Sequence, residues 1–368
     1  MNVCAHPMTR SVRRVSVLLA ALLSGCSLRW ESAEDTGSPA HAEQVSYGEG
    51  AGMVVYTTAG LVRHDADLAS RSAAIRLDNS MGELKDVPFS FSMADDGKVA
   101  AVAFSNTTER DVVLYDPGSF DELITLDVQT LRSFPVQGVA LDPRGERVFV
   151  RGDFWAMYDV ATGERLWGAA PEGECCGLEE PTFSADGAVL YGFEGTRLEA
   201  RRAQTGDVIF SVESGSTPGK PVSLARSGSD GILVGARSMT SGGDPEVHEQ
   251  YVFWSEADGR VVRELPQFVD RLLVGTFPGG GHVKCAPGGD VCASGLVIPE
   301  SSRTLPPQYS VAVWTSEGEL LHELPVFANG LAFSPDGARL AVAGGEAALY
   351  VVHDGSLVAS VSYTYADF

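Results

Sequence analysis

The sequence predicts an all-β protein, a seven-bladed β-propeller whose blades each contain four antiparallel strands. Two observations lead to this prediction: a Gly-containing hairpin that returns along the chain, and a second family of turns that alternates with it. The clearest hairpin is Phe333 to Gly337, with the letters FSPDG, and the apolar run Leu340 to Ala343 follows it. A strand–turn–strand unit repeated at a near-constant interval is typical of a propeller.

The first turn family joins the two inner strands of each predicted blade. A glycine supplies the positive φ that such a hairpin needs, and Asp or Pro before it starts the turn. From position 97 to position 337 the glycines stand 48, 42, 44, 58 and 48 residues apart, and one earlier step reaches position 52. This spacing predicts seven blades. Their hairpin glycines are Gly52, Gly97, Gly145, Gly187, Gly231, Gly289 and Gly337.

The second turn family joins the two outer strands, and β-rich runs stand on either side of most of these turns. Its glycines are Gly118, Gly163, Gly206, Gly259, Gly318 and Gly355. Both families together predict four short strands per repeat from about residue 44 to residue 364. The alternative is a pair of β-sandwiches in tandem, which do not repeat a turn in fixed phase.

We expect the ring to close by pairing the two ends of the propeller. Val45 to Tyr47 precedes the first blade and Tyr363 to Tyr365 follows the last one, and both segments are strand-like. An unpaired edge strand promotes aggregation, and closure removes that edge.

The N-terminal segment has the pattern of a signal peptide. Three arginines precede residue 15, and the run Val15 to Leu23 is apolar except for one serine. Nine residues cannot span a bilayer core of about 30 Å as a helix, but they suit the apolar region of a signal peptide. The alternative is a buried apolar segment beside a free cysteine. The sequence does not decide between Met1 and Met8 as the start.

The four residues that end this segment resemble the lipobox of bacterial lipoproteins. They read Leu23-Ser24-Gly25-Cys26. The resemblance implies cleavage between Gly25 and Cys26, acylation of Cys26, and attachment to the membrane through that lipid. We therefore divide the chain into a signal peptide at 1–25, a polar, lipidated flexible tether at 26–43 and the propeller at 44–368.

The signal-peptide pattern and the lipobox-like residues predict a bacterial cell-envelope protein. Ser27 follows the lipidated position, and by resemblance to enterobacterial sorting it favours the outer membrane, on its periplasmic side or surface, over the inner membrane. The net charge of the chain argues against nucleic acids as partners. The chain carries 27 basic and 49 acidic residues, a net charge of −22, and such a surface repels phosphate backbones. We therefore expect no nucleic-acid binding.

The cysteines of the exported part are candidates for disulfides. Cys285 and Cys292 flank the hairpin at Gly289 and can face each other across its two strands, so a disulfide there is favoured over two free thiols. Cys175 and Cys176 are adjacent, and either a strained disulfide between neighbours or two free thiols fits them. Four cysteines allow three pairings, which the sequence alone leaves open.

Metal and cofactor motifs are weak in this sequence. The histidines are scattered without metal-ligand spacing. Asp65 and Asp67 could start a calcium loop, but no Gly and distal Glu follow at EF-hand spacing, so two solvated carboxylates are favoured. We expect no metal and no cofactor.

Two resemblances bear on function. The Ser-Pro-Asp-Gly hairpin at 334–337 and the aromatic-ended third strand resemble bacterial WD-repeat-like propellers, although the Trp-Asp dipeptide is missing. That family implies a non-catalytic platform for proteins or small ligands, and we expect no enzyme. The alternative is a quinone-dependent or other propeller enzyme. Asp159 to Trp167 reads Asp-x-x-Thr-Gly-x-x-x-Trp and precedes Cys175-Cys176, as in quinoprotein alcohol dehydrogenases. However, the full motif occurs once, and no calcium ligands are identifiable.

Long segments on one face of the predicted ring indicate where a protein partner binds. They are Met239 to Gln250 in blade 5, Pro299 to Gln308 in blade 6, Pro266 to Gly281 between those blades and Gly168 to Glu180 between blades 3 and 4. The three segments of blades 5 and 6 are adjacent and are expected to form one binding surface. Long loops on a rigid scaffold are disproportionately binding elements, although neutral insertion gives the same pattern. The candidate binding-face residues are His248, Phe268, Arg271, Phe277 and Arg303.

Overall fold

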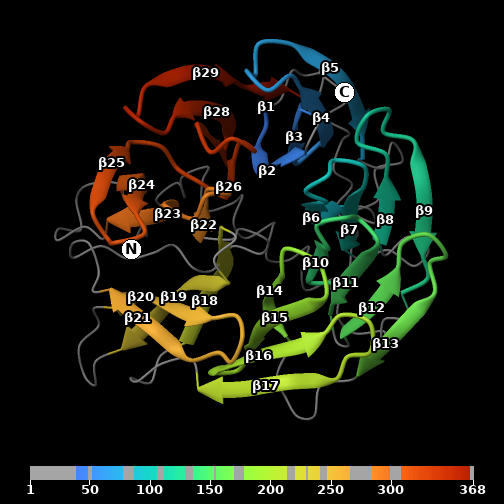
Figure 1. The fold of residues 1–368 in the computed structure, drawn as a ribbon. Coiled ribbons are helices and arrows are strands. Elements are labelled where there is room, and N and C mark those ends of the chain that lie inside the picture. Colours follow the sequence, from blue (N-terminus) through green and yellow to red (C-terminus); the bar gives the residue numbers. More distant parts are fainter. Residues whose placement is uncertain are drawn as a thin grey trace, which may run out of the picture.

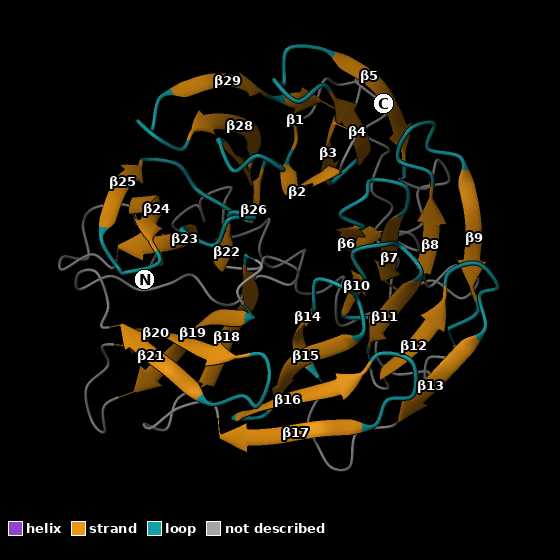
Figure 2. Ribbon diagram, in the orientation of Figure 1, coloured by secondary structure: helices purple, strands orange, loops and turns teal. Residues whose placement is uncertain are grey.

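The computed structural model describes residues 39–48, 52–77, 87–105, 112–128, 136–152, 155–169, 178–213, 220–228, 231–240, 247–265, 283–298 and 308–364. These residues form seven four-stranded antiparallel sheets arranged as blades around a centre (Figure 1). This arrangement confirms the predicted seven-bladed β-propeller. The described residues contain strands, turns and loops but no helix (Figure 2), and thus none that could cross a membrane.

The strands of each blade follow one another in sequence from the centre of the ring to its rim. Blade 1 contains β2 (Ala42–Gly48), β3 (Gly52–Thr57), β4 (Gly60–His64) and β5 (Arg71–Arg76). Blade 2 contains β6 (Val87–Met93), β7 (Ala100–Ser105), β8 (Val112–Tyr115) and β9 (Glu122–Leu126). Blade 3 contains β10 (Gly138–Leu141), β11 (Arg147–Arg151), β12 (Trp155–Asp159) and β13 (Arg165–Ala169).

The remaining four blades have the same order. Blade 4 contains β14 (Glu179–Phe183), β15 (Val189–Glu194), β16 (Arg197–Arg202) and β17 (Val208–Glu213). Blade 5 contains β18 (Lys220–Ser227), β19 (Ile232–Thr240), β20 (Val247–Ser255) and β21 (Val261–Leu265). Blade 6 contains β22 (Val283–Cys285), β23 (Val291–Ile298), β24 (Gln308–Thr315) and β25 (Leu320–Leu324). Blade 7 contains β26 (Gly330–Phe333), β27 (Arg339–Gly344), β28 (Glu346–Val351) and β29 (Leu357–Val361).

The turn glycines predicted from the sequence occupy the conformation that their turns require. All seven inner-hairpin glycines, from Gly52 to Gly337, have a positive φ. Of the outer-turn glycines, five have a positive φ as well, whereas blade 2 uses Phe120 in place of Gly118. In blade 1 the outer turn has no glycine, and Leu68 takes the positive φ there. The Asp65 carboxylate organises this turn, because it accepts hydrogen bonds from the Ala69 amide and the Ser70 hydroxyl, each at 2.8 Å.

A bulge marks the outer edge of every blade. In all seven blades the pairing between the third and fourth strands shifts register at one place, for example between Met157 and Tyr158 in blade 3. Bulges increase the local twist and discourage pairing of an exposed edge with another chain. The fourth strands therefore tolerate exposed apolar residues such as Leu123 and Val262, whose relative exposures are 50% and 59%.

The hydrophobic core lies between the blades. The buried apolar residues of the described chain form seven clusters, and each cluster combines residues from two adjacent blades. Trp254 and Trp314, each one residue before the end of the third strand in blades 5 and 6, are fully buried in these clusters. Each blade thus buries both of its faces against neighbours, so the apolar surface is removed from water only when the ring is closed.

The ring closes through the two ends of the described chain, but the partner differs from the predicted one. β30 (Tyr363–Thr364) pairs antiparallel with β1 (Pro39–Ala40). The predicted partner Val45 to Tyr47 lies instead inside β2, where it pairs with β3. The expectation of a tether up to residue 43 also needs correction, because β1 and the start of β2 occupy residues 39–43.

Candidate functional site

A cavity of about 540 Å³ lies at the centre of the ring, and residues from all seven inner strands line it. These strands are β2, β6, β10, β14, β18, β22 and β26, which surround the centre in Figure 1. The cavity reaches the inner hairpins, because Asp95, Pro143, Pro287 and Pro335 from those turns belong to its wall. Described residues of all seven blades therefore meet at this cavity.

The strand registers define two layers of equivalent residues around the cavity, and each layer has one exception. In the deeper layer six residues are small and the seventh is a lysine. This layer consists of Ser46, Ser92, Ala140, Thr182, Ala225, Lys284 and Ala332. The next layer, toward the hairpins, holds large apolar side chains or a half-cystine in six blades and an arginine in one. It consists of Tyr47, Met93, Leu141, Phe183, Arg226, Cys285 and Phe333.

Among the described residues, three charged side chains line the cavity: Asp95, Arg226 and Lys284. Arg226 on β18 and Lys284 on β22 belong to adjacent blades, whereas Asp95 follows β6 on the opposite side of the ring (Figure 1). Arg226 Nη2 and Asp95 Oδ2 are 3.7 Å apart, and the two side chains are 25% and 69% exposed. At that separation the ion pair spans the channel without a hydrogen bond, and water weakens it.

Lys284 has a different environment. Its side chain is exposed to the cavity, and it makes no ion pair with a described residue. The surrounding blades lower its pKa, mainly through desolvation, against the opposing charges of Glu180 and Asp95. Desolvation likewise raises the pKa of Asp95, although Arg226 and Lys284 oppose this effect. Both directions have one cause, since charged groups inside the ring have lost part of their hydration.

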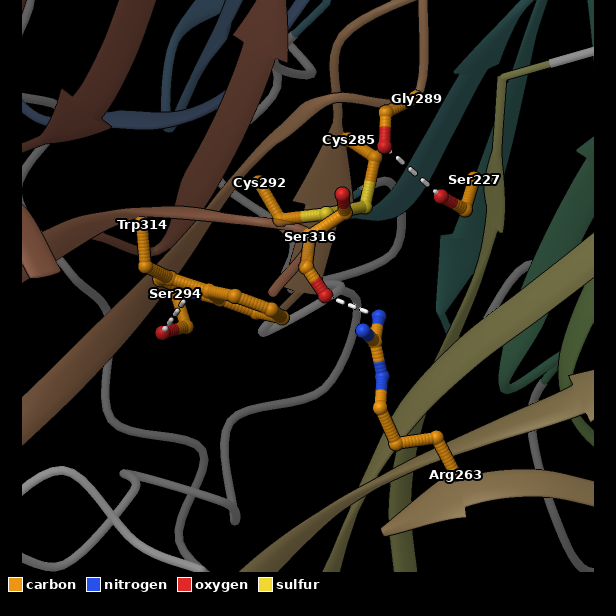
Figure 3. Close-up of a disulfide and its surroundings, with 8 residues drawn as sticks. All are labelled: Ser227, Arg263, Cys285, Gly289, Cys292, Ser294, Trp314 and Ser316. Atoms are coloured by element: carbon orange, nitrogen blue, oxygen red, sulfur yellow. Dashed lines mark hydrogen bonds between the residues drawn. A yellow bond between two sulfur atoms is a disulfide. The ribbon is translucent and has the colours of Figure 1, made fainter. Parts of the chain in front are cut away.

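The predicted disulfide between Cys285 and Cys292 is present (Figure 3). It joins directly opposed residues of β22 and β23 with Cα atoms 3.9 Å apart. β22 has only three residues, so the disulfide holds a short strand whose middle residue is Lys284. The Ser227 hydroxyl also donates to the Gly289 carbonyl at 3.2 Å, which ties blade 5 to the hairpin of blade 6 (Figure 3).

The motif from Asp159 to Trp167 connects blades 3 and 4. Asp159 accepts hydrogen bonds from the amide and the hydroxyl of Thr162, both at 2.9 Å, and so shapes the outer turn of blade 3. Trp167 Nε1 donates to the Ala203 carbonyl in blade 4 at 2.7 Å, and its ring covers Gly206. The motif therefore has a complete structural explanation within this fold.

Other blades use different side chains at the position of Trp167. Arg263 in blade 5 donates to the Ser316 carbonyl of blade 6 (Figure 3), and it lies over the Phe253 ring at 4.3 Å. His322 Nε2 in blade 6 lies 2.9 Å from the His353 carbonyl of blade 7. The sequence shows only one such motif because Arg263 and His322 make contacts equivalent to that of Trp167 but are different residue types.

Several residues predicted from the sequence lie outside the described residues. They are Gly25, Cys26, Cys175, Cys176, Phe268, Arg271, Phe277 and Arg303. His248 belongs to β20, where it pairs with Met239 of β19. The segment from Met239 to Gln250 is therefore not one long loop: β19 extends to Thr240 and β20 begins at Val247, which leaves 241–246 as the connection.

The charged residues of the cavity were not singled out in the sequence. Asp95, Arg226 and Lys284 match no motif, and they are far apart along the chain. One signal was available: Lys284 stands five residues before its hairpin glycine, where blades 2, 3, 4 and 7 have Ser, Ala, Thr and Ala. Among the described residues, no three His, Cys, Asp or Glu side chains are grouped closely enough to bind a metal ion.

Comparison with known proteins gives no family for this chain. No protein-family model matches it, and no curated protein is significantly similar to it in sequence. The class defined by the structure is therefore architectural: a seven-bladed β-propeller whose central cavity is lined by apolar and polar residues together with Asp95, Arg226 and Lys284.

Proposed function

We propose that the chain is a non-catalytic binding protein of the bacterial cell envelope, anchored by a lipid on Cys26. The observation that supports binding most directly is the central cavity, to which all seven blades contribute. A cavity of about 540 Å³ falls within the range of roughly 300–1,000 Å³ that small-ligand sites occupy, and apolar walls with a few placed polar groups are typical of such sites.

The lining favours binding over catalysis. Among its described residues, the wall combines two cations with one carboxylate, Asp95, rather than a group of carboxylates. The Asp159–Trp167 motif, on which the quinone-dependent alternative rests, holds blades 3 and 4 together through Trp167 and Ala203. We therefore propose a rigid platform that positions partners or ligands on its surface and in its cavity.

The anchor and location rest on the N-terminal sequence. The basic residues, the short apolar run and the lipobox-like Leu23 to Cys26 favour export and acylation. Two or more acyl chains give stable anchoring. We propose the outer membrane, on its periplasmic side or surface, in preference to the inner membrane.

A protein partner is proposed on the face formed by the connections of blades 5 and 6. These include the segments 241–246 and 299–307, which follow β19 and β23. This face is opposite to the inner hairpins, because second-to-third connections and inner hairpins lie at opposite ends of the strands. The cavity and the proposed protein-binding face can therefore be tested separately.

Two measurements test this function. Cell fractionation should find the wild-type chain with the membranes and Cys26→Ala in the soluble fraction; a variant that still sediments after a salt wash excludes the lipid anchor. Tagged full-length protein, solubilised in mild detergent, should capture a specific partner from envelope extract. A second variant with 241–246 and 299–307 replaced by short turns should lose that partner while its melting temperature stays unchanged. Full capture by the shortened variant excludes this face.

A further inference from the structure

We propose that the central cavity binds a small organic monocarboxylate, whose carboxylate group lies between Arg226 and Lys284 and whose apolar body fills the space beside them. This inference deepens the proposed binding function and rests on it. It depends on the described cavity wall alone, and no residue of the proposed protein-binding face takes part.

The first step is the break in the sevenfold pattern. Six blades place small side chains in the deeper layer, and blade 6 alone places Lys284 there. Six blades place apolar side chains or a half-cystine in the next layer, and blade 5 alone places Arg226 there. The two exceptions are on neighbouring inner strands, so both cations enter the cavity from the same side of the ring.

The second step is that no described carboxylate forms a hydrogen bond with either cation. Arg226 has Asp95 at 3.7 Å, beyond the 2.7–2.9 Å of a charge-assisted hydrogen bond. Lys284 makes no ion pair with a described residue. Among the described residues the cavity wall carries two cations and one carboxylate, while Glu180 and Glu256 add negative charge close to Lys284 and Arg226. Because none of these carboxylates forms a hydrogen bond with either cation, both cations keep donors that an anion in the cavity can use.

The third step concerns solvation. The enclosing blades remove water from Lys284, as the lowered pKa of its ammonium group indicates. A ligand carboxylate forms an ion pair with this ammonium group. The attraction between the two charges is stronger inside the ring than at an open surface because the effective dielectric constant is lower. Arg226 offers a planar pair of donors that matches the two carboxylate oxygens.

The fourth step selects the ligand class. Apolar side chains that are each 4–8% exposed contribute atoms to the wall beside polar ones such as Ser46, Ser92 and Thr182; they are Phe91, Met93, Leu141, Phe183, Leu331 and Phe333. A ligand with an apolar body and one charged group matches this mixed wall, whereas an inorganic anion matches its polar part alone. Asp95 in the wall and Glu180 close to Lys284 oppose additional negative charge. One carboxylate therefore suits the site better than a phosphate with about two negative charges at neutral pH.

The test uses two probes of the same shape, one anionic and one neutral: naphthalene-1-carboxylate and naphthalene-1-carboxamide. The full-length protein is titrated with each, and binding is followed by probe fluorescence and calorimetry. We expect the carboxylate to bind about tenfold more tightly than the amide, since a hydrogen bond to a charged group exceeds a neutral one by about that factor. Equal affinities, or no binding of the carboxylate at millimolar concentration, overturn the inference.

Variants of Lys284 and Arg226 then test whether these two residues bind the carboxylate group of the probe. Lys284→Met and Arg226→Gln should each weaken carboxylate binding about tenfold and leave amide binding unchanged. Lys98→Met is the matched control: Lys98 is 77% exposed, pairs with Asp96 at 2.8 Å and is not part of the cavity wall. It makes the same change in net charge, so an equal loss in both lysine variants indicates a general charge effect and overturns the site.

Asp95→Asn should have the opposite effect on the affinity for the carboxylate probe. The variant removes the carboxylate that competes for Arg226, so carboxylate binding should become tighter. Weaker binding in Asp95→Asn overturns the proposed arrangement. A partner captured from envelope extract together with no preference for the carboxylate probe refutes this inference but leaves the binding function intact. Probe binding without any captured partner refutes only the protein-binding part.

Discussion

The Tyr363 hydroxyl and Nε2 of His64 are 3.0 Å apart, a hydrogen bond between residues 299 positions apart in the chain. His64 ends the third strand of blade 1, and Tyr363 begins β30, which pairs with β1. Both side chains are 3% exposed. The two ends of the propeller are thus joined by a buried polar contact as well as by strand pairing.

Other contacts strengthen the same seam. The Asn329 side-chain amide donates to Glu43 at 2.8 Å, from the start of blade 7 to the start of blade 1. At the rim, Arg339 of blade 7 forms an ion pair with Asp67 in the outer turn of blade 1. Asp67, considered from the sequence as part of a calcium loop, therefore has a role in closure. Contacts at the centre, in the core and at the rim all oppose opening of the ring.

Tyr363→Phe should destabilise the protein by about 1–2 kcal/mol, because it removes a buried hydrogen bond and leaves a ring nitrogen of His64 without its partner. Chemical unfolding monitored by circular dichroism measures the change. Tyr350→Phe is the matched control, since Tyr350 is half-buried and its hydroxyl makes no hydrogen bond with a described residue. Equal losses in both variants contradict a specific role of the Tyr363 hydroxyl.

His64 should also make the stability sensitive to mild acid. Burial lowers its pKa below the ordinary value, although the Ser70 backbone and Asp65 oppose the shift. The unfolded chain therefore takes up a proton at about pH 6.5 while the folded state does not, so stability is full above that pH and falls as the pH drops toward the folded pKa. The comparison is unfolding free energy from pH 7.5 to 5.

His64→Gln isolates this contribution, because the other titrating groups are the same in both proteins. The difference between wild type and variant should be constant above about pH 7 and should shrink as the pH falls below 6.5. A difference that does not change with pH shows that His64 does not titrate differently on folding. The carboxylate of Asp65, whose pKa is lowered by its hydrogen bond with Ser70, acts only at lower pH.

The sequence predicted the repeating part of the fold because the signals are local. A glycine with positive φ, an Asp or Pro before it and apolar runs on each side specify a hairpin within about ten residues. Closure was predicted in outline but with the wrong segment, since the partner of Tyr363 depends on contacts across the whole chain. Pro39–Ala40 lies in a polar stretch and gave no strand signal.

The candidate site was harder to predict for a related reason. Lys284 and Arg226 line the same cavity because their inner strands are adjacent in the ring, and Asp95 lines it from the opposite side. None of the three has a neighbour in sequence that suggests a site. Cys285 and Cys292, by contrast, were predicted because both their spacing and the hairpin between them are local.

Gly206→Ala should cost more than the same change at Gly195. Both glycines have a positive φ, where an added Cβ costs about 1–2 kcal/mol. At Gly195 an added Cβ meets nothing within 4 Å, whereas at Gly206 it lies 2.7 Å from the ring of Trp167. Displacement of that ring adds about 1–3 kcal/mol. Urea unfolding of the two variants measures the difference.

Trp167→Ala provides the internal control for this packing. In that background the extra cost at Gly206 should disappear, so Gly206→Ala and Gly195→Ala should destabilise equally. Residues in contact show such non-additivity, whereas independent sites do not. An unchanged difference between the two glycine variants contradicts the proposed docking of blade 3 on blade 4 through Trp167.

The disulfide should stabilise blade 6 against local opening and should also raise the free energy of unfolding of the whole ring. Replacing both Cys285 and Cys292 with Ala removes a cross-link that closes a loop of seven residues' separation, and chain entropy sets the loss at about 2.5 kcal/mol. Wild-type protein in reductant should unfold at nearly the same urea concentration as the double variant. Hydrogen exchange should become faster first in β22 and β23, because a three-residue strand has few ladder bonds to replace the cross-link. Uniform acceleration in all seven blades contradicts a local role and indicates that the disulfide acts only through the unfolded chain.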